Sequence, residues 1–263
     1  MIALGFLAGA NGRWVADALR ATGIPYDFEW VPGETRVNLK IKDSLTGTET
    51  EINEPGFQVG ADHLQSLMQR VGEKAGQCSV TVFSGSLPPG VPPEVYGEFI
   101  RTARNRGAQT ILDTAGAALK HGIAAGPDLI KPNRAEAEEV LETRIDGEAG
   151  LVGAARRLLE MGAQVVVLSL GADGAMAVSQ RESWRAYPPS VTAASSIGAG
   201  DAMVAALAFA MKRGLALEDA LRLATAAGAA TVATNGSATE LGSIEEYSKR
   251  VTLHSIGETV GVR

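Results

Sequence analysis

Strongly apolar runs recur along this chain and alternate with segments of helical periodicity, and this alternation restricts its fold more than any other feature. The most continuous run is QVVVLSLG at residues 164–171, and shorter runs lie at residues 2–8, 79–85 and 109–113. Runs that are apolar at successive positions indicate strands buried on both faces, as in a parallel sheet. The intervening segments, such as GRWVADALRATG at residues 12–23, have apolar residues at helical spacing. The alternation predicts a doubly wound α/β fold with a mostly parallel sheet flanked by helices.

Residues 35–56 break this alternation, because polar and apolar side chains alternate there. The segment TRVNLKIKDSLTGTETEINEPG predicts two strands joined by a turn at Gly47. Val37, Leu39 and Ile41 share one face of the first strand, and the other face is polar. We expect a small β lid or a contact in a homodimer, and an ordinary edge hairpin is the alternative. With no long linker or internal repeat, residues 1–263 are expected to form one domain with this lid hairpin.

Composition excludes several classes of protein. The 263 residues carry a formal net charge of −6, which argues against non-specific binding of nucleic acid. The single cysteine, Cys78, cannot form an internal disulfide, and its apolar neighbours indicate a structural thiol in a buried strand. The three histidines do not have metal-binding spacing. No apolar run is long enough to cross a bilayer, so we expect no membrane partner and a cytoplasmic location.

A glycine-rich turn precedes a long apolar segment with helical periodicity. Gly198, Ala199 and Gly200 come directly before Asp201. The free backbone amides of such a turn at a helix start bind anions, and phosphate is the natural ligand. A carboxylate beside that anion can accept the proton of a hydroxyl group that attacks a phosphoryl group. The alternative is that Asp201 is only the N-cap of the helix and the glycines only form the turn.

Other polar segments follow predicted strands, at the sheet edge where open α/β folds bind ligands. SLGADGAM leaves a strand and opens into a turn with Gly171 and Gly174. In KPNRAEAEE, Asn133 and Glu136 share one face of the first helical turn, where their oxygens could hold Mg²⁺ through its waters. A capping box is the alternative for this pair. FSGSLPPG is a further polar strand end.

Three common nucleotide or catalytic motifs are missing from the sequence. It contains no GxxxxGKS/T, no GxSxG and no GxGxxG. A P-loop ATPase, a serine hydrolase and a dinucleotide-binding dehydrogenase therefore lose support.

Together, the four polar segments resemble, in identity and order, the motifs of the PfkB, or ribokinase-like, family of sugar kinases. The resemblance extends over nearly the whole chain and implies the ribokinase-like fold. It implies an ATP-dependent kinase in which Asp201 is the catalytic base and residues 198–200 form the anion hole. It also implies that Asn133 and Glu136 help to hold Mg²⁺. The residues implied to lie near ATP are Lys131, Asn133, Ser169, Gly171, Gly174, Thr225 and Ala229.

Within the family, ETRVNLKI, EINEPG, SGSLPPG and KPN look most similar to the branch that phosphorylates sugar phosphates. The implied reaction converts fructose 1-phosphate to fructose 1,6-bisphosphate, and tagatose-6-phosphate or fructose-6-phosphate kinases are alternatives. Arg36 would contact the sugar phosphate, with Ser84 and Gly85 near it, because a guanidinium fork can bond two phosphate oxygens. A solvated hairpin charge is the alternative for Arg36. Kinases of nucleosides or unphosphorylated sugars stay open.

One family feature has no counterpart in this sequence. Members normally carry a further N-terminal segment with an early aspartate and a GGxGxN sugar site, and no GGxGxN occurs here. Without that segment we expect weak sugar binding and an exposed sheet edge. A catalytically impaired nucleotide-binding protein is therefore an alternative of another class, and a plain structural domain is a third.

Overall fold

The computed structural model of the chain describes residues 1–42, 48–192, 195–234 and 241–256. Its strands are β1 (Ala3–Leu7), β2 (Tyr26–Trp30), β3 (Asn38–Lys42), β4 (Glu49–Asn53), β5 (Val80–Ser84), β6 (Gln109–Asp113), β7 (Leu129–Ile130), β8 (Val165–Ser169), β9 (Ala175–Ser179), β10 (Ser183–Tyr187) and β11 (Thr252–Ser255). Its helices are α1 (Gly9–Ala21), α2 (Ala61–Ala75), α3 (Val95–Asn105), α4 (Gly116–Ile123), α5 (Arg134–Leu141), α6 (Gly147–Glu160), the short 3-10 helix η1 (Gly171–Asp173), α7 (Ala199–Arg213), α8 (Leu217–Val232) and α9 (Leu241–Arg250).

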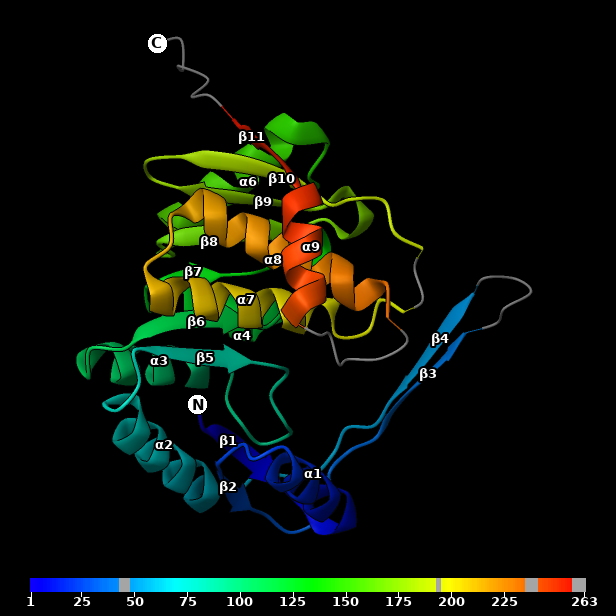
Figure 1. The fold of residues 1–263 in the computed structure, drawn as a ribbon. Coiled ribbons are helices and arrows are strands. Elements are labelled where there is room, and N and C mark those ends of the chain that lie inside the picture. The colour runs from blue at the N-terminus through cyan, green and yellow to red at the C-terminus, as the bar shows by residue number, and fades with distance from the viewer. Residues whose placement is uncertain (43–47, 193–194, 235–240, 257–263) are drawn as a thin grey trace.

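Seven strands form the central sheet, in the order β11-β10-β9-β8-β7-β6-β5 (Figure 1). The four strands from β5 to β8 are parallel neighbours. The apolar run of β8 lies in the middle of the sheet, where Val166, Val167 and Leu168 are fully buried. Helices flank this sheet, so the predicted α/β fold is confirmed.

The other half of the sheet is antiparallel. β9, β10 and β11 each run antiparallel to the strand before them in the sheet. Only Leu170, η1 and Gly174 connect β8 to β9. A connection this short makes a hairpin, because a parallel neighbour needs a crossover of about a dozen residues or more. The sheet is therefore mixed, and the prediction of a mostly parallel sheet describes β5–β8 but not β9–β11.

Helices cover both faces of the central sheet (Figure 1). On one face, α3, α4 and α6 contribute the fully buried side chains of Ile100, Leu119 and Leu158 to one apolar cluster. On the other face, α7 and α8 contribute Leu207 and Leu221 to a second cluster. The apolar segment after the glycine turn forms α7, which confirms its predicted helical structure.

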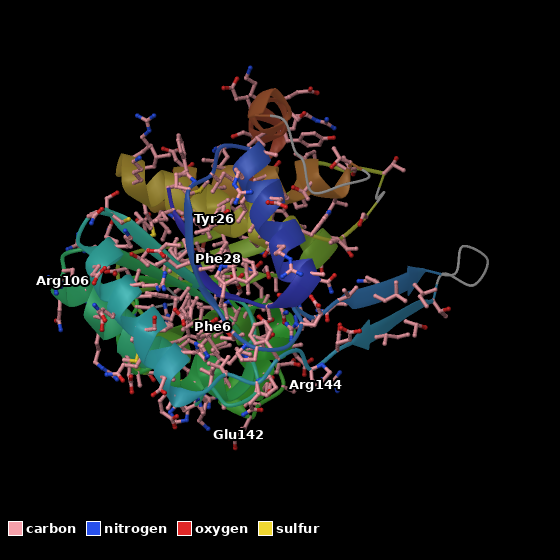
Figure 2. All side chains as sticks on the ribbon, turned by 90° about the horizontal axis from the view of Figure 1, so that it is seen from below. Phe6, Tyr26, Phe28, Arg106, Glu142 and Arg144 are labelled. Atoms are coloured by element: carbon pink, nitrogen blue, oxygen red, sulfur yellow. The ribbon has the colours of Figure 1, made fainter. Side chains whose placement is uncertain are left out.

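β1 and β2 form a parallel pair of their own, while the central sheet ends at β5. Figure 2, seen from below, shows Phe6, Tyr26 and Phe28 on this pair, with α1 and α2 on either side. The rings of Tyr26 and Phe28 are stacked, with their centroids 5.4 Å apart. Leu4 and Phe6 of β1 pack against the apolar cluster of the central sheet, so the small sheet shares that core.

A polar network fastens α2 to β2. The Glu29 carboxylate accepts a hydrogen bond of 2.7 Å from the Ser66 hydroxyl and one of 2.9 Å from Arg70. The Nδ1 atom of His63 lies 2.8 Å from the same carboxylate. The hydrogen bond from Ser66 lowers the pKa of Glu29 below its ordinary value, and the bond with His63 acts in the same direction. Glu29 is therefore held as an anion on the inner side of α2.

β3 and β4 form an antiparallel ribbon that projects from the body of the molecule (Figure 1). The ribbon is a two-stranded sheet separate from the central sheet, so it does not lie along the edge of that sheet. Leu39 pairs opposite Ile52, and together with Val37 and Ile41 they form an apolar face that is about half exposed, at 49–53%. The predicted turn at Gly47 lies outside the described residues.

Cys78 lies just before β5 and is half-buried, so its predicted place in a buried strand is wrong. The strand β5 itself ends the sheet, and Phe83 is its one buried residue. Among the described residues, no helix is both long enough and apolar enough to cross a membrane.

Candidate active site

Polar residues follow four neighbouring strands of the central sheet at the same edge. β5 ends at Ser84, β6 at Asp113 and β8 at Ser169, and Lys131 directly follows β7. Because these strands are parallel neighbours, their carboxyl ends lie side by side. This is the edge at which open α/β sheets bind ligands. The topology thus gathers segments that lie far apart in the sequence.

The glycine turn before α7 has the geometry of an anion site. Gly198 is the N-cap and has a left-handed conformation, with φ of 78°, which a side chain would disfavour. No side chain caps the first amides of α7, so they remain available to a ligand. Asp201 is the third residue of the helix and is exposed. The alternative that Asp201 is the N-cap is therefore wrong.

A second helix packs closely against this turn. A Cβ atom on Gly228 of α8 would lie 3.1 Å from Cγ of Met203 and 3.6 Å from the carbonyl oxygen of Ala199. Only a residue without a side chain fits easily at that position. Thr225 and Ala229, one helical turn apart on α8, are both buried. The hydroxyl of Thr225 is buried with no hydrogen-bond partner among the described residues.

A buried ion pair lies beside the glycine turn. The Nζ atom of Lys131 is 3.1 Å from Oδ1 of Asp113, and the two side chains are only 6% and 15% exposed. The same Nζ atom lies 3.6 Å from the position that a Cβ on Gly200 would occupy. The positive charge of Lys131 therefore faces the amino end of α7, where the helix dipole also favours an anion.

Asn133 and Glu136 form the capping box of α5. Glu136 N donates to Oδ1 of Asn133 at 2.9 Å, and Asn133 N donates to Oε2 of Glu136 at 2.8 Å. Burial raises the pKa of the Glu136 carboxyl above its ordinary value, and the negative charge of Asp113 raises it further. The amide of Asn133 and the charge of Lys131 act in the opposite direction.

This pair fits a magnesium ion held indirectly. No group of three or more His, Cys, Asp or Glu side chains that could hold a metal occurs among the described residues. Mg²⁺ is commonly bound through one or two carboxylates together with waters and substrate phosphates. A cation beside the half-buried Glu136 would offset the cost of its negative charge. The donor set therefore suits Mg²⁺ that arrives with a phosphate ligand.

The turn after β8 has a fixed shape and sits next to the capping box. Ser169 forms an isolated parallel bridge with Asn133. A Cβ on Gly174, whose φ is 87°, would lie 2.1 Å from the carbonyl oxygen of Ala186, so only glycine fits. The buried guanidinium of Arg185 donates a hydrogen bond of 2.6 Å to the carbonyl oxygen of Asp173, and this bond stabilises the end of η1. Gly171, by contrast, has open space around it.

The turn after β5 forms the other side of the site. Nη2 of Arg36 donates a hydrogen bond of 2.6 Å to the hydroxyl of Ser86. The Tyr96 hydroxyl lies beneath this turn and donates to the carbonyl oxygens of Ser84 and Gly85, at 3.1 and 2.9 Å. Burial raises the pKa of Tyr96 to about 12, and the Asp113 charge contributes. Arg36 thus lies near Ser84 and Gly85, as predicted, because it bonds to Ser86, the next residue in the same turn.

The residues before Arg36 anchor the ribbon to α1. The carboxylate of Glu34 accepts hydrogen bonds from the backbone amides of Ala10 and Asn11, at 3.0 and 2.7 Å. The amide of Asn11 and then that of Ala10 lower the pKa of Glu34 below its ordinary value. The hydroxyl of Thr35 accepts from the amide of Ala8 at 2.9 Å. The chain's own carboxylate therefore fills the anion site at the start of α1.

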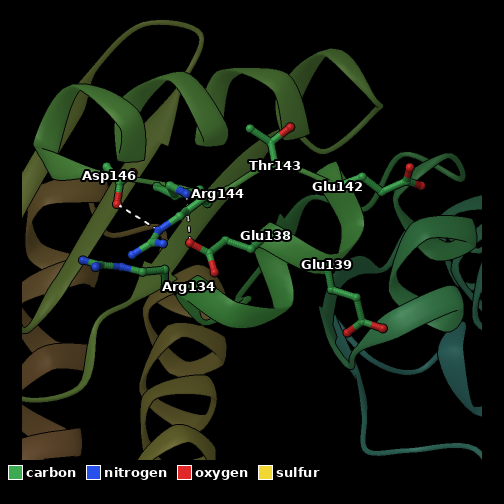
Figure 3. Close-up of a pocket in the computed structure, with 8 residues that line it drawn as sticks. Arg134, Glu138, Glu139, Glu142, Thr143, Arg144 and Asp146 are labelled. Atoms are coloured by element: carbon green, nitrogen blue, oxygen red, sulfur yellow. Dashed lines mark hydrogen bonds and ion pairs between the residues drawn. The ribbon is translucent and has the colours of Figure 1, made fainter.

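A hollow of about 710 Å³ lies apart from these residues (Figure 3). It is open and follows α5 into the loop before α6. None of the predicted site residues is in its lining, so its size does not make it the candidate site. The lining residues are Arg134, Glu138, Glu139, Glu142, Thr143, Arg144, Ile145 and Asp146.

Contacts link some of the predicted site residues directly. Asp113 contacts Ser84 and Lys131, and Lys131 in turn lies next to Gly200. The carboxylate of Asp201 forms no hydrogen bond or ion pair with any described residue, and only its position in the first turn of α7 places it near the glycine turn. Asp113 was missed because, in the sequence, it is only the last residue of the strand QTILD. A carboxylate at the carboxyl end of a buried strand is the signal that could have identified it.

Known proteins resemble the chain along most of its length. Residues 2–243 match the pfkB family of carbohydrate kinases. The 1-phosphofructokinase of Rhodobacter capsulatus is 40% identical over 223 residues, which cover 84% of this chain and 71% of that protein. The 1-phosphofructokinase of Escherichia coli (strain K12) is 36% identical over 228 residues, which cover 87% of this chain and 73% of that protein.

Solved structures agree with these matches. The structure of phosphofructokinase-2 from Escherichia coli in complex with potassium has 29% sequence identity and a TM-score of 0.88, and the match covers 95% of this chain and 81% of that one. A possible 1-phosphofructokinase from Thermotoga maritima has 26% identity and a TM-score of 0.89, and the match covers 97% of this chain and 82% of that one.

Proposed function

The chain belongs to the pfkB family of carbohydrate kinases, and we propose that it acts in this family as a 1-phosphofructokinase. It transfers the γ-phosphoryl group of ATP to fructose 1-phosphate and yields fructose 1,6-bisphosphate. The observation that carries this assignment is the identity of 36–40% to 1-phosphofructokinases over 71–73% of their length. Arg36 beside the turn after β5 supports a phosphorylated sugar as the acceptor.

Asp201 is the general base of the proposed reaction. Its carboxylate is exposed at the amino end of α7, and no described side chain competes for it. It accepts the proton of the free primary hydroxyl of the sugar as the oxygen attacks the γ-phosphorus in line with the leaving group. The positive end of the helix dipole favours a negative charge at this position.

The glycine turn and Lys131 stabilise the charge on the transferred phosphoryl group. No side chain caps the first turn of α7, so the amides of Gly200 and Asp201 can bond the phosphoryl oxygens. Lys131 adds a positive charge next to Gly200 of the same turn. Asn133 and Glu136 would hold Mg²⁺, which neutralises phosphate charge when bound.

The turn after β8 receives the nucleotide in this proposal. Ser169, Gly171 and Gly174 line its strand end, and Thr225 and Ala229 form the nearby helical wall. Gly171 has open space beside it that a ligand can use. We place the enzyme in the cytoplasm, because both of its substrates are charged phosphates.

A fructose-6-phosphate kinase is the second candidate. Phosphofructokinase-2 from Escherichia coli, solved in complex with fructose-6-phosphate, is 28% identical with a TM-score of 0.85. Tagatose 6-phosphate presents the same chemical groups to Arg36 and belongs to the same substrate class.

The ribbon of β3 and β4 is a dimer contact in the same proposal. Its apolar face is about half exposed, and a second copy would bury it. Phosphofructokinase-2 from Escherichia coli has a tetrameric form, so association occurs among similar proteins.

A substrate panel tests the function directly. ADP release by the purified chain is measured with fructose 1-phosphate, fructose 6-phosphate, tagatose 6-phosphate and fructose in parallel. We expect the highest kcat/KM with fructose 1-phosphate. A preference for another sugar phosphate would change the assigned substrate but keep the assignment as a sugar-phosphate kinase. ATP binding without turnover on any of the four would contradict the kinase proposal for this chain.

A further inference from the structure

Asp113 is the carboxylate that holds Lys131 in place. The Nζ–Oδ1 distance is 3.1 Å, and both side chains are largely buried. Among the described residues, Asp113 is the only acid that forms an ion pair with Lys131. Lysine side chains are rarely buried, because removing an ammonium group from water is costly. The burial of Lys131 therefore calls for an explanation.

The free side of the ammonium faces the glycine turn. Lys131 Nζ lies 3.6 Å from the place where a Cβ of Gly200 would be, so no side chain separates it from the turn. An ammonium group has three donors, and Asp113 engages it from one direction. The remaining donors are available to an anion bound at the start of α7.

The backbone of Asp113 holds the opposite half of the site. The amide of Gly85 donates to the carbonyl oxygen of Asp113 at 3.0 Å. The Thr114 hydroxyl donates to the carbonyl oxygen of Gly85 at 2.8 Å. Asp113 therefore contacts Lys131 with its side chain and the turn after β5 with its main chain.

We propose that Asp113 is a positioning residue for phosphoryl transfer, which acts by aiming the Lys131 ammonium at the phosphate bound by residues 198–200. This inference rests on the proposed kinase function. Asp113 does not touch the reacting atoms. Its carboxylate pairs with the ammonium of the buried lysine and limits the rotamers of that side chain, so that the ammonium is already in position when ATP binds.

A purely structural role would give a different pattern from this one. A buried ion pair contributes little net stability on average, so stability alone does not explain the pair. If Asp113 acts through Lys131, its removal should matter only while Lys131 is present. A structural role would instead harm the protein whether or not the lysine is there.

A double-mutant cycle separates the two roles. The variants are Asp113→Asn, Lys131→Met and the double variant, with Asp113→Glu as the conservative replacement. Asp128→Asn is the matched control. The carboxylate of Asp128 accepts hydrogen bonds from the amide and the hydroxyl of Thr110 at the start of β6, whereas Asp113 lies at the end of β6. Each variant is measured for kcat and both KM values with ATP and fructose 1-phosphate, for binding of AMP-PNP by calorimetry, and for thermal unfolding.

We expect Asp113→Asn to lower kcat roughly 10- to 100-fold and to weaken AMP-PNP binding, with little change in the KM for the sugar phosphate. The double variant should be no worse than Lys131→Met alone, and Asp113→Glu should recover part of kcat. Asp128→Asn should retain normal kcat. Multiplying losses in the double variant, or full activity of Asp113→Asn, would overturn the proposal.

The failure of the kinase function is recognised separately. If the wild-type chain turns over none of the sugars, the proposed function fails, and the same cycle is then read from AMP-PNP binding alone. Non-additive losses of affinity in that cycle would support the role of Asp113 in holding Lys131, and additive losses would reject it.

Discussion

Arg36 donates a hydrogen bond of 2.6 Å to the hydroxyl of Ser86, although 50 positions separate them in the sequence. The bond joins the root of the projecting ribbon to the turn after β5. It gives the guanidinium a defined place at the edge of the site while most of its donors remain available for a phosphate group.

Replacement of Arg36 by methionine should raise the KM for fructose 1-phosphate by roughly 10- to 100-fold, because a hydrogen bond to a charged group is lost. The KM for ATP should stay nearly constant in steady-state assays. Arg36→Lys keeps the positive charge but loses the two-pronged guanidinium group, so its KM for fructose 1-phosphate should lie between those of the wild type and Arg36→Met. Equal changes in both KM values would contradict a sugar-phosphate contact.

Replacement of Asp201 by asparagine should lower kcat by roughly 100- to 10,000-fold, because the general base is removed. ATP affinity, measured by calorimetry, should remain close to that of the wild type. Asp219→Asn, in the first turn of the neighbouring helix α8, is the control. Near-normal turnover by Asp201→Asn would show that another group takes the proton.

Replacement of Gly174 by alanine should destabilise the fold by about 3 kcal/mol or more, since its Cβ would collide with the Ala186 carbonyl oxygen in a left-handed backbone. Gly171→Ala is the matched control, because its φ is also positive but its surroundings are open. Its cost should be only about 1–2 kcal/mol. Urea unfolding compares the two, and similar losses would mean that the turn adapts to the added methyl group.

Acid should weaken the contact between α2 and β2. The pKa of Glu29 is lowered in the folded protein, so its contribution is present above its unfolded pKa of about 4.5 and is lost as the pH falls below that value. The free energy of unfolding of Glu29→Gln should therefore fall below that of the wild type at pH 7 and approach it near pH 3. Glu148→Gln on the exposed side of α6 is the control. A difference that does not change with pH would argue against an ionised Glu29.

The double replacement Leu39→Ser and Ile41→Ser should shift the chain toward the monomer, because it removes apolar area from the ribbon. Sedimentation velocity over a range of concentrations measures the change. Phe209→Ser removes an equally exposed apolar side chain from α7 and should leave the association unchanged. An unchanged sedimentation coefficient in the ribbon variant would place the contact elsewhere or nowhere.

The sequence predicted best those parts that depend on local pattern. The run at β8 and the strand Gln109–Asp113 were recognised because their apolar residues are continuous. The antiparallel addition of β9 was not, because it depends on the length of the connection and not on the strand's own residues. The burial of Cys78 was overestimated because an apolar strand at the end of a sheet has the same composition as a central one.

The site residues, too, were predicted where they have a local sequence pattern and missed where they depend on strand pairing. The glycine turn, Asn133 and Glu136 carry their own local signals at a helix start. The capping box was foreseen as an alternative because its two residues are three apart. Asp113 was missed because its partner Lys131 lies just after the neighbouring strand, and the pairing of β6 with β7 is a property of the sheet.

The attachment of the ribbon at Glu34 and Thr35 fixes the point from which Arg36 begins. Hydrogen bonds join these two residues to Ala8, Ala10 and Asn11 at the start of α1. Arg36 directly follows this fixed point, so in the proposed enzyme its guanidinium would be preorganised for a sugar phosphate, and binding would cost little conformational entropy at this side chain.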